Sequence, residues 1–162
     1  MKKIISLFLV LATLLTFAGC SIKDRKDKVF TCEELSIVLN DGYVETQVEG
    51  YTACFDSSTV AVFVLKEEFS LMAGFEDYTL EQYADLVLQA NSIRNPQRAD
   101  TDGLTCMKYS YFNTEKNQDY TYLASLYKSD NAFWMVQFVC ESEDYPEHEA
   151  YFIERAKTVK FS

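Results

Sequence analysis

The chain is poor in the residues that build the commonest catalytic and phosphate-binding sites. Its 162 residues include only one histidine, five glycines and two prolines. A Ser–His–Asp centre would have to use His148, and the sequence contains neither a nucleophile elbow nor a glycine-rich oxyanion loop. No phosphate-cradling glycine motif occurs either. We therefore predict that the protein is not an enzyme and needs no cofactor.

Positive charge is also scarce. Fifteen lysines and arginines stand against 25 aspartates and glutamates, which gives a net charge of −10 at pH 7. A field of that sign repels DNA and RNA, so nucleic acid is not an expected partner. There is no tandem repeat and no low-complexity tract, and an apolar content of 48% suffices for one packed core.

Residues 1–19 have the pattern of a signal peptide. Lys2 and Lys3 form a basic start, and Ile4–Phe17 follows without a charge. As a helix this run would be about 21 Å long, short of the ~30 Å hydrocarbon thickness of a bilayer. It therefore fits the apolar core of a secretory signal better than a membrane span.

The junction after this run is Phe17-Ala18-Gly19-Cys20. It resembles the lipobox of bacterial lipoproteins, although Phe17 stands where leucine is commoner. The resemblance implies that a diacylglyceryl group joins the Cys20 sulfur and that cleavage follows Gly19. Two or three acyl chains, such as palmitate, hold a protein stably on a membrane. The alternative is an ordinary signal peptide with a coincidental cysteine.

This reading sets the domain organisation and the location. Residues 1–19 are removed, residues 20–28 form a lipidated tether, and residues 29–162 form a single globular domain. We expect the protein on the outer, extracytoplasmic face of the cell membrane, with the membrane itself as a partner through the N-terminal lipid. Loss of Lys2 and Lys3 with the leader changes the net charge from −10 to −12.

A β-meander is the strongest structural pattern in the domain. Its strands are predicted at Leu104–Phe112, Asp119–Lys128 and Ala132–Glu141, separated by short polar breaks. Before it, Val29–Leu39 is β-like with a break at Glu33-Glu34. Tyr51–Phe55 and Thr59–Lys66 form a second hairpin, whose later arm is apolar on both sides and so predicts a central strand.

Two helices interrupt the strands. Thr79 and Gln82 make a capping box, and apolar residues then recur at helical spacing: Leu80, Tyr83, Ala84, Val87 and Leu88. This helix ends before Asn95-Pro96, and Arg94–Asp102 is predicted as a loop. Pro146 suits the first turn of a second helix. A short last strand follows at Thr158–Phe161.

The element order β-β-β-α-β-β-β-α-β predicts an α+β fold with a mostly antiparallel sheet. Phe30–Asn40, the Thr79–Asn91 helix, Ala132–Phe138 and the Glu147–Phe161 segment are similar to small secreted lipoproteins of the PsbP/DcrB-like superfamily. The resemblance implies an antiparallel sheet flanked by helices, an α-β-α sandwich. Relatives range from photosystem assembly factors to uncharacterised lipoproteins, so the resemblance does not carry a function.

Two groups of residues are candidates for binding. Tyr109 and Tyr111 share a face of one strand, Tyr120 and Tyr122 share a face of the next, and together they suit a recognition patch for protein or glycan. The alternative is that they cover the sheet beneath a helix. The acidic segment 141–149 offers Glu143, Asp144, Glu147 and His148 as weak ligands for a divalent cation, although acids there also stabilise a helix start.

Four cysteines remain after Cys20: Cys32, Cys54, Cys106 and Cys140. They form no C-x-x-C motif and allow three disulfide pairings, or none. With no catalytic motif, we expect a non-enzymatic binding or structural module acting on an extracytoplasmic protein or cell-wall component. The alternative is a protein that binds a small ligand or divalent cation through segment 141–149 or a sheet–helix cleft.

Overall fold

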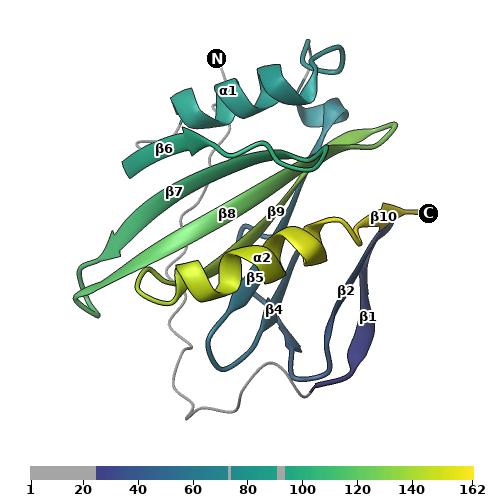
Figure 1. The fold of residues 1–162 in the computed structure, drawn as a ribbon. Coiled ribbons are helices and arrows are strands. Elements are labelled where there is room, and N and C mark those ends of the chain that lie inside the picture. The colour runs from purple at the N-terminus through teal and green to yellow at the C-terminus, as the bar shows by residue number, and fades with distance from the viewer. Residues whose placement is uncertain (1–24, 73, 91–93) are drawn as a thin grey trace.

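The computed structural model describes residues 25–72, 74–90 and 94–162 (Figure 1). The predicted leader, Cys20 and most of the tether lie outside these residues. The larger sheet contains β3 (Val44–Thr46), β4 (Ala53–Asp56), β5 (Ala61–Glu68), β6 (Arg94–Arg98), β7 (Thr105–Asn113), β8 (Gln118–Lys128) and β9 (Ala132–Glu141). The smaller one contains β1 (Asp27–Cys32), β2 (Leu35–Asn40) and β10 (Lys160–Phe161). The helices are α1 (Leu80–Ala90), α2 (Tyr145–Ala156) and the short 3-10 helix η2 (Phe69–Leu71).

The larger sheet is antiparallel and has the strand order β3-β4-β5-β9-β8-β7-β6. β7, β8 and β9 form the predicted meander, and β9 pairs with β5 on its other side. α1 covers one face of this sheet and α2 with the smaller sheet covers the other, which explains why β9 and the first half of β5 are buried on both faces. The predicted break at Glu33-Glu34 is the turn between the antiparallel strands β1 and β2, and the predicted second hairpin is the antiparallel pair β4–β5.

The helices lie on opposite faces of this sheet, which gives an α-β-α sandwich (Figure 1). On the α1 face, Tyr83, Ala84 and Val87 are buried against the sheet, as the predicted apolar stripe requires. The capping box is also present, since the backbone N–H of Thr79 donates to Gln82 Oε1 and the N–H of Gln82 to Thr79 Oγ1.

On the opposite face, α2 and the small sheet cover a second core. Pro146 lies in the first turn of α2, as predicted, and Phe152 packs on Phe138 with ring centroids 5.2 Å apart. Phe30 of β1 packs on Phe55 of β4 in the same core. The α+β class and the flanked antiparallel sheet are therefore confirmed.

The structure differs from the prediction in the segment 94–102 and at the start of the first strand. Part of the predicted loop Arg94–Asp102 forms the edge strand β6, which pairs with β7 across an irregular register. Pro96 made a strand unattractive from sequence, but an edge strand with a bulge tolerates a residue that has no backbone N–H. The first strand also begins at Asp27, inside the predicted tether.

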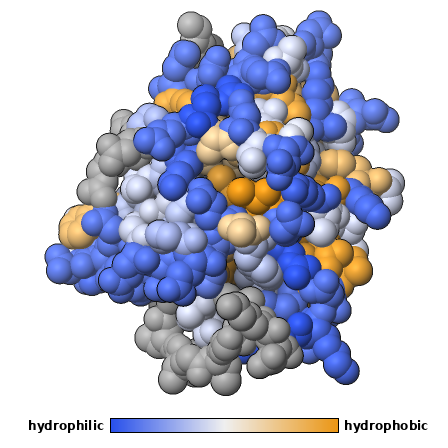
Figure 2. Space-filling view, viewed as in Figure 1, coloured by the Kyte–Doolittle hydropathy of each residue, from blue (hydrophilic) through white to orange (hydrophobic). Residues whose placement is uncertain are grey.

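The surface is mainly hydrophilic, and hydrophobic residues form separate patches on the face shown in Figure 2. Large apolar side chains with high exposure are Val29, Val44, Leu71 and Phe112, each on a different element. Across the described residues, none of the helices combines the length and the apolar character that crossing a membrane requires.

Candidate functional site

A buried glutamine lies at the centre of the α1 face. Gln137 of β9 is opposite Phe63 on β5 and Ala124 on β8, and its side chain is 0% exposed. The register continues outward from Phe63 to Cys54 and then to Thr46 at the sheet edge. Because directly opposed residues share a face, Thr46, Cys54, Phe63 and Gln137 form one row across four strands.

Two of the tyrosines singled out in the sequence border this row. The Tyr109 hydroxyl donates a hydrogen bond to Gln137 Oε1, and the Tyr109 ring stacks on Tyr122 at 4.9 Å. Burial raises the pKa of Tyr109 well above its ordinary value, and it raises that of Tyr122 as well. Both phenols are therefore neutral at physiological pH and act only as hydrogen-bonding groups.

A third phenol comes from the segment between β3 and β4. Tyr51 stacks on Phe63 with ring centroids 4.8 Å apart, and its backbone N–H donates to the carbonyl of Val48 at 3.2 Å. Burial raises the pKa of Tyr51 to about 12, and the neighbouring Gln137 amide opposes that rise. The segment therefore folds back over the sheet and sets Tyr51 beside Gln137.

The same segment surrounds a hollow of about 420 Å³, lined by residues 45–53. That volume is in the range of small-molecule sites. Gln137 is not among the lining residues: it is buried in the core, where its side chain hydrogen-bonds with the phenols of Tyr109 and Tyr51. The lining itself carries the Thr46 hydroxyl and the ring of Tyr51.

The four tyrosines do not form an exposed patch. Tyr109, Tyr120 and Tyr122 are buried, and Tyr111 is half-buried. Tyr109 faces Tyr122 across β7 and β8, and Tyr111 faces Tyr120. The four residues therefore cover the sheet on the α1 face, which is the alternative left open from sequence, and two of them frame the Gln137 site.

The acidic segment before and within α2 does not form a metal centre in the described residues. Within ranges 25–72, 74–90 and 94–162, no three His, Cys, Asp or Glu side chains are placed to hold one ion. His148 stacks on Phe152 at 5.7 Å, while Glu143 and Glu147 are exposed and Asp144 stands at the N-cap position of α2 without a side-chain capping hydrogen bond. These residues therefore start and pack the helix.

The four described cysteines are free thiols. Cys54, Cys106 and Cys140 lie on β4, β7 and β9, no two of which are neighbours in the sheet. Strands two apart are separated by about 9–10 Å, beyond the ~7 Å Cα limit for a disulfide. Burial raises the pKa of Cys54 to about 11 and that of Cys106 and Cys140 to about 12, so these thiols are poor nucleophiles.

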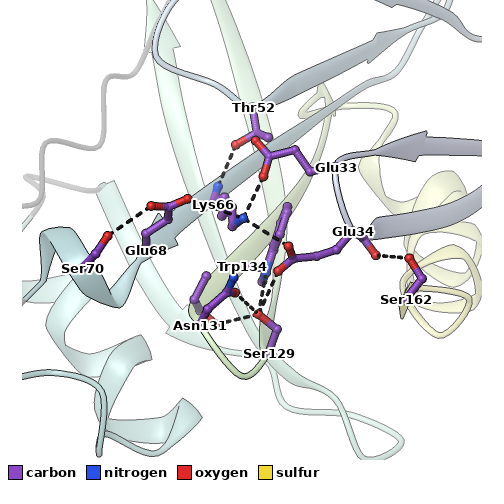
Figure 3. Close-up of polar contacts among 11 residues, drawn as sticks. Glu33, Glu34, Thr52, Lys66, Glu68, Ser70, Ser129, Asn131, Trp134 and Ser162 are labelled. Carbon is purple, nitrogen blue, oxygen red and sulfur yellow. Dashed lines mark hydrogen bonds and ion pairs between the residues drawn. The ribbon is translucent and has the colours of Figure 1, made fainter.

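An ionic cluster joins the two sheets (Figure 3). Lys66 Nζ donates to Glu33 at 2.8 Å and to Glu34 at 3.2 Å, and it lies 5.2 Å from the centre of the Trp134 ring. Glu33 has a φ of 49°, which costs a non-glycine residue roughly 1–2 kcal/mol, and its ion pair with Lys66 offsets part of that cost. The cluster fastens the β1–β2 turn to β5.

Sequence reasoning missed Gln137 and Tyr51 as site residues. Gln137 is recognisable as the one polar residue among Phe133, Met135, Gln137 and Val139 on its strand face, where a core position normally carries an apolar side chain. The sequence predicts Tyr51 in a strand, whereas β4 begins at Ala53, and no local pattern indicates that residues 47–52 fold back over the α1 face.

Comparison with known proteins bears on the fold. No protein-family model matches the chain, and a search of curated proteins found no match. The solution structure of PsbP (CyanoP) from Synechocystis sp. PCC 6803 is similar, with a TM-score of 0.54 at 13% identity, covering 91% of this chain and 98% of that one.

A crystal structure from Bacteroides thetaiotaomicron gives a TM-score of 0.56 at 16% identity. It covers 83% of this chain, which spans only about half of that protein, 48% of its length. At such low identities the likeness concerns architecture alone. The chain therefore has a PsbP-like α+β fold.

Proposed function

We propose that the protein is a membrane-anchored extracytoplasmic lipoprotein whose domain is a non-enzymatic binding module for a small ligand. The observation that carries this proposal is the hollow of about 420 Å³ that residues 45–53 surround, with the Thr46 hydroxyl and the half-buried ring of Tyr51 in its lining. A concave surface of that volume with a few polar groups is the form that small-molecule sites take.

The anchor is supported by the N-terminal sequence. Its basic start, uncharged run and lipobox-like junction together suit diacylglyceryl transfer to Cys20 and cleavage after Gly19. A short tether at residues 20–28 would then hold the domain at the outer face of the membrane. A ligand site on a domain held there would be accessible from the extracytoplasmic space.

Binding is favoured over catalysis by the chemistry near Gln137. Its neighbours are phenols and the Cys54 thiol, and burial raises the pKa of each, so they stay neutral and offer neither a base nor an activated nucleophile. His148, the single histidine of the sequence, lies on α2 against the opposite core.

A small ligand is also favoured over the other partners considered from sequence. Of the four tyrosines that the sequence offers as contacts for a protein or glycan, three are buried. The cation version relied on residues 143–148, where the described side chains do not converge on one point. The hollow at residues 45–53 instead provides a concave surface of small-molecule size with polar and aromatic side chains in its lining.

The test uses the full-length protein extracted in mild detergent from the membranes that produce it. Native mass spectrometry should find a small molecule bound without a covalent bond and released on denaturation. A Cys20→Ser variant is the matched control, because it should lose the lipid and the membrane association but retain the ligand. Recovery of a crosslinked protein partner with no small molecule released would contradict the proposal.

A further inference from the structure

The smaller sheet carries unpaired positive charge on a protein that is acidic as a whole. Lys28 on β1 and Lys160 on β10 are exposed, and so is Lys26, which directly precedes β1. None of these three lysines forms an ion pair with another described residue. The chain nevertheless has a net charge of −10, so this sheet differs in sign from its surroundings.

The acids of the smaller sheet and of its β1–β2 turn are neutralised by cations from other elements. Asp27 pairs with Arg155 of α2 at 2.9 Å, and Lys66 of β5 pairs with both Glu33 and Glu34. One exposed acid, Asp41, follows β2, and its backbone N–H donates to the carbonyl of Lys26 at 2.8 Å. The three exposed lysines therefore outweigh the acids that remain.

The outer face of the smaller sheet combines this charge with exposed apolar surface. Val29 is opposite Val38, and Thr31 is opposite Ser36, which is in turn opposite Lys160. Alternate residues of a strand share a face, so Val29, Val38 and Lys160 lie together on the outer face, away from the core. Val29 is 61% exposed. Apolar side chains beside lysines are typical of protein surfaces that lie on a membrane.

The opposite side of the protein has the opposite charge. Segments 47–52 and 74–90 lie on the α1 face of the larger sheet, whereas the smaller sheet covers the other face (Figure 1). These two segments contain five acids and no lysine or arginine, and only Asp85 among the five forms an ion pair with another described residue, Arg98. An anionic surface therefore attracts the smaller sheet and repels the α1 side.

The predicted anchor lies close to the smaller sheet along the chain. β1 is an edge strand and begins at Asp27, seven residues after Cys20. Seven residues span at most about 25 Å when fully extended. Confinement at that distance acts as a high effective concentration, so weak attraction suffices for contact. Each lysine near an anionic leaflet favours contact about fivefold.

We infer that the outer face and the β1 edge of the smaller sheet lie against the membrane and contact anionic lipid headgroups through Lys26, Lys28 and Lys160. This inference rests on the anchor in the proposed function and adds the orientation of the domain. The α1 face then points away from the membrane, with residues 47–52 of the hollow, so a ligand reaches the hollow from the extracytoplasmic side.

The test measures which lysines the membrane covers. The full-length lipidated protein is extracted in mild detergent and transferred to vesicles of phosphatidylcholine, with or without phosphatidylglycerol. A water-soluble acylating reagent then modifies exposed amines, and mass spectrometry gives the rate at each lysine. We expect Lys28 and Lys160 to react at least about threefold more slowly on the anionic vesicles. Lys116, exposed between β7 and β8, should react equally on both.

Two charge reversals with the same change in net charge show whether the protection depends on this face. Lys160→Glu replaces an attraction by a repulsion at the membrane and should remove most of the protection of Lys28. Lys116→Glu is the matched control and should leave that protection unchanged. Both positions are exposed, so neither variant disturbs the core.

The outcomes separate the orientation from the anchor and from ligand binding. Equal labelling of Lys28 on the two kinds of vesicle, or equal loss of its protection in both variants, would overturn the orientation, whereas lipid found on Cys20 by intact mass would still support the anchor. A chain without lipid on Cys20 would overturn the anchor and the orientation together. Release of a small molecule in native mass spectrometry tests the binding function separately.

Discussion

The ionic cluster at Lys66 gives the most direct prediction about stability. Lys66→Met keeps the apolar stem against Trp134 but removes the ammonium, whose side chain is 8% exposed and which contacts Glu33, Glu34 and Glu68. Hydrogen bonds to charged groups contribute about 1.5–3 kcal/mol, and partial exposure of the carboxylates reduces that value. We expect a loss of about 1–3 kcal/mol, or about 3–10 °C in melting temperature.

Calorimetry with matched variants tests this value. Lys160→Met, which removes an exposed lysine in β10, is the control and should melt within about 1 °C of the unaltered protein. The difference between the two variants should shrink in 1 M NaCl, where the Debye length is about 3 Å. Equal melting temperatures for both variants, at low and at high salt, would refute the cluster as a fastening between the sheets.

The pH dependence of the cluster follows from the direction of the pKa shift. The hydrogen bond with Glu33 raises the pKa of Lys66 above its ordinary 10.5. A raised folded-state pKa means that the stabilisation is fully present below that ordinary value and is lost as the pH rises through the folded value. The difference between Lys66→Met and the unaltered protein should therefore be constant from neutral pH to about pH 10 and shrink above it.

Two other sites give predictions of their own. The Tyr83 hydroxyl donates a hydrogen bond to the Glu67 carboxylate, and burial raises the pKa of Glu67 above its ordinary 4.5. Protonation of Glu67 therefore stabilises the fold, and this stabilisation is complete below pH 4.5 and lost as the pH rises through the pKa of Glu67 in the folded protein. In urea unfolding, Glu67→Gln should remove that pH dependence. Tyr83→Phe should lower the free energy of unfolding by about 1–3 kcal/mol at neutral pH, because the Glu67 carboxylate loses its hydrogen-bond donor. A Tyr83→Phe protein as stable as the unaltered protein would contradict this. Iodoacetamide should label Cys54, Cys106 and Cys140 slowly in the native protein and all four described thiols in urea without reductant, whereas fewer than four labelled thiols would reveal a disulfide.

The architecture was predictable because local patterns and tertiary structure agree. The Thr79–Gln82 capping box, the apolar stripe of α1 and the alternation in the meander each specify an element through short-range spacing. β6 escaped prediction because it depends on pairing with β7, a tertiary contact that overrides the breaking effect of Pro96.

The candidate site was only partly predictable. Alternation placed Tyr109 and Tyr122 on strand faces correctly, but the choice between an exposed patch and a covered face depends on where α1 and residues 47–52 pack. Tyr51 and Gln137 lie far apart in sequence and meet only through the fold. A polar residue inside an apolar strand was the one local sign of the site.

Native mass spectrometry of the protein extracted from its own membranes tests the central claim most directly. The account predicts a chain beginning at Cys20, increased in mass by acyl chains, together with a small molecule that dissociates on denaturation. A chain beginning elsewhere without lipid would contradict the anchor. A lipidated chain that carries no small molecule would contradict the proposed binding function.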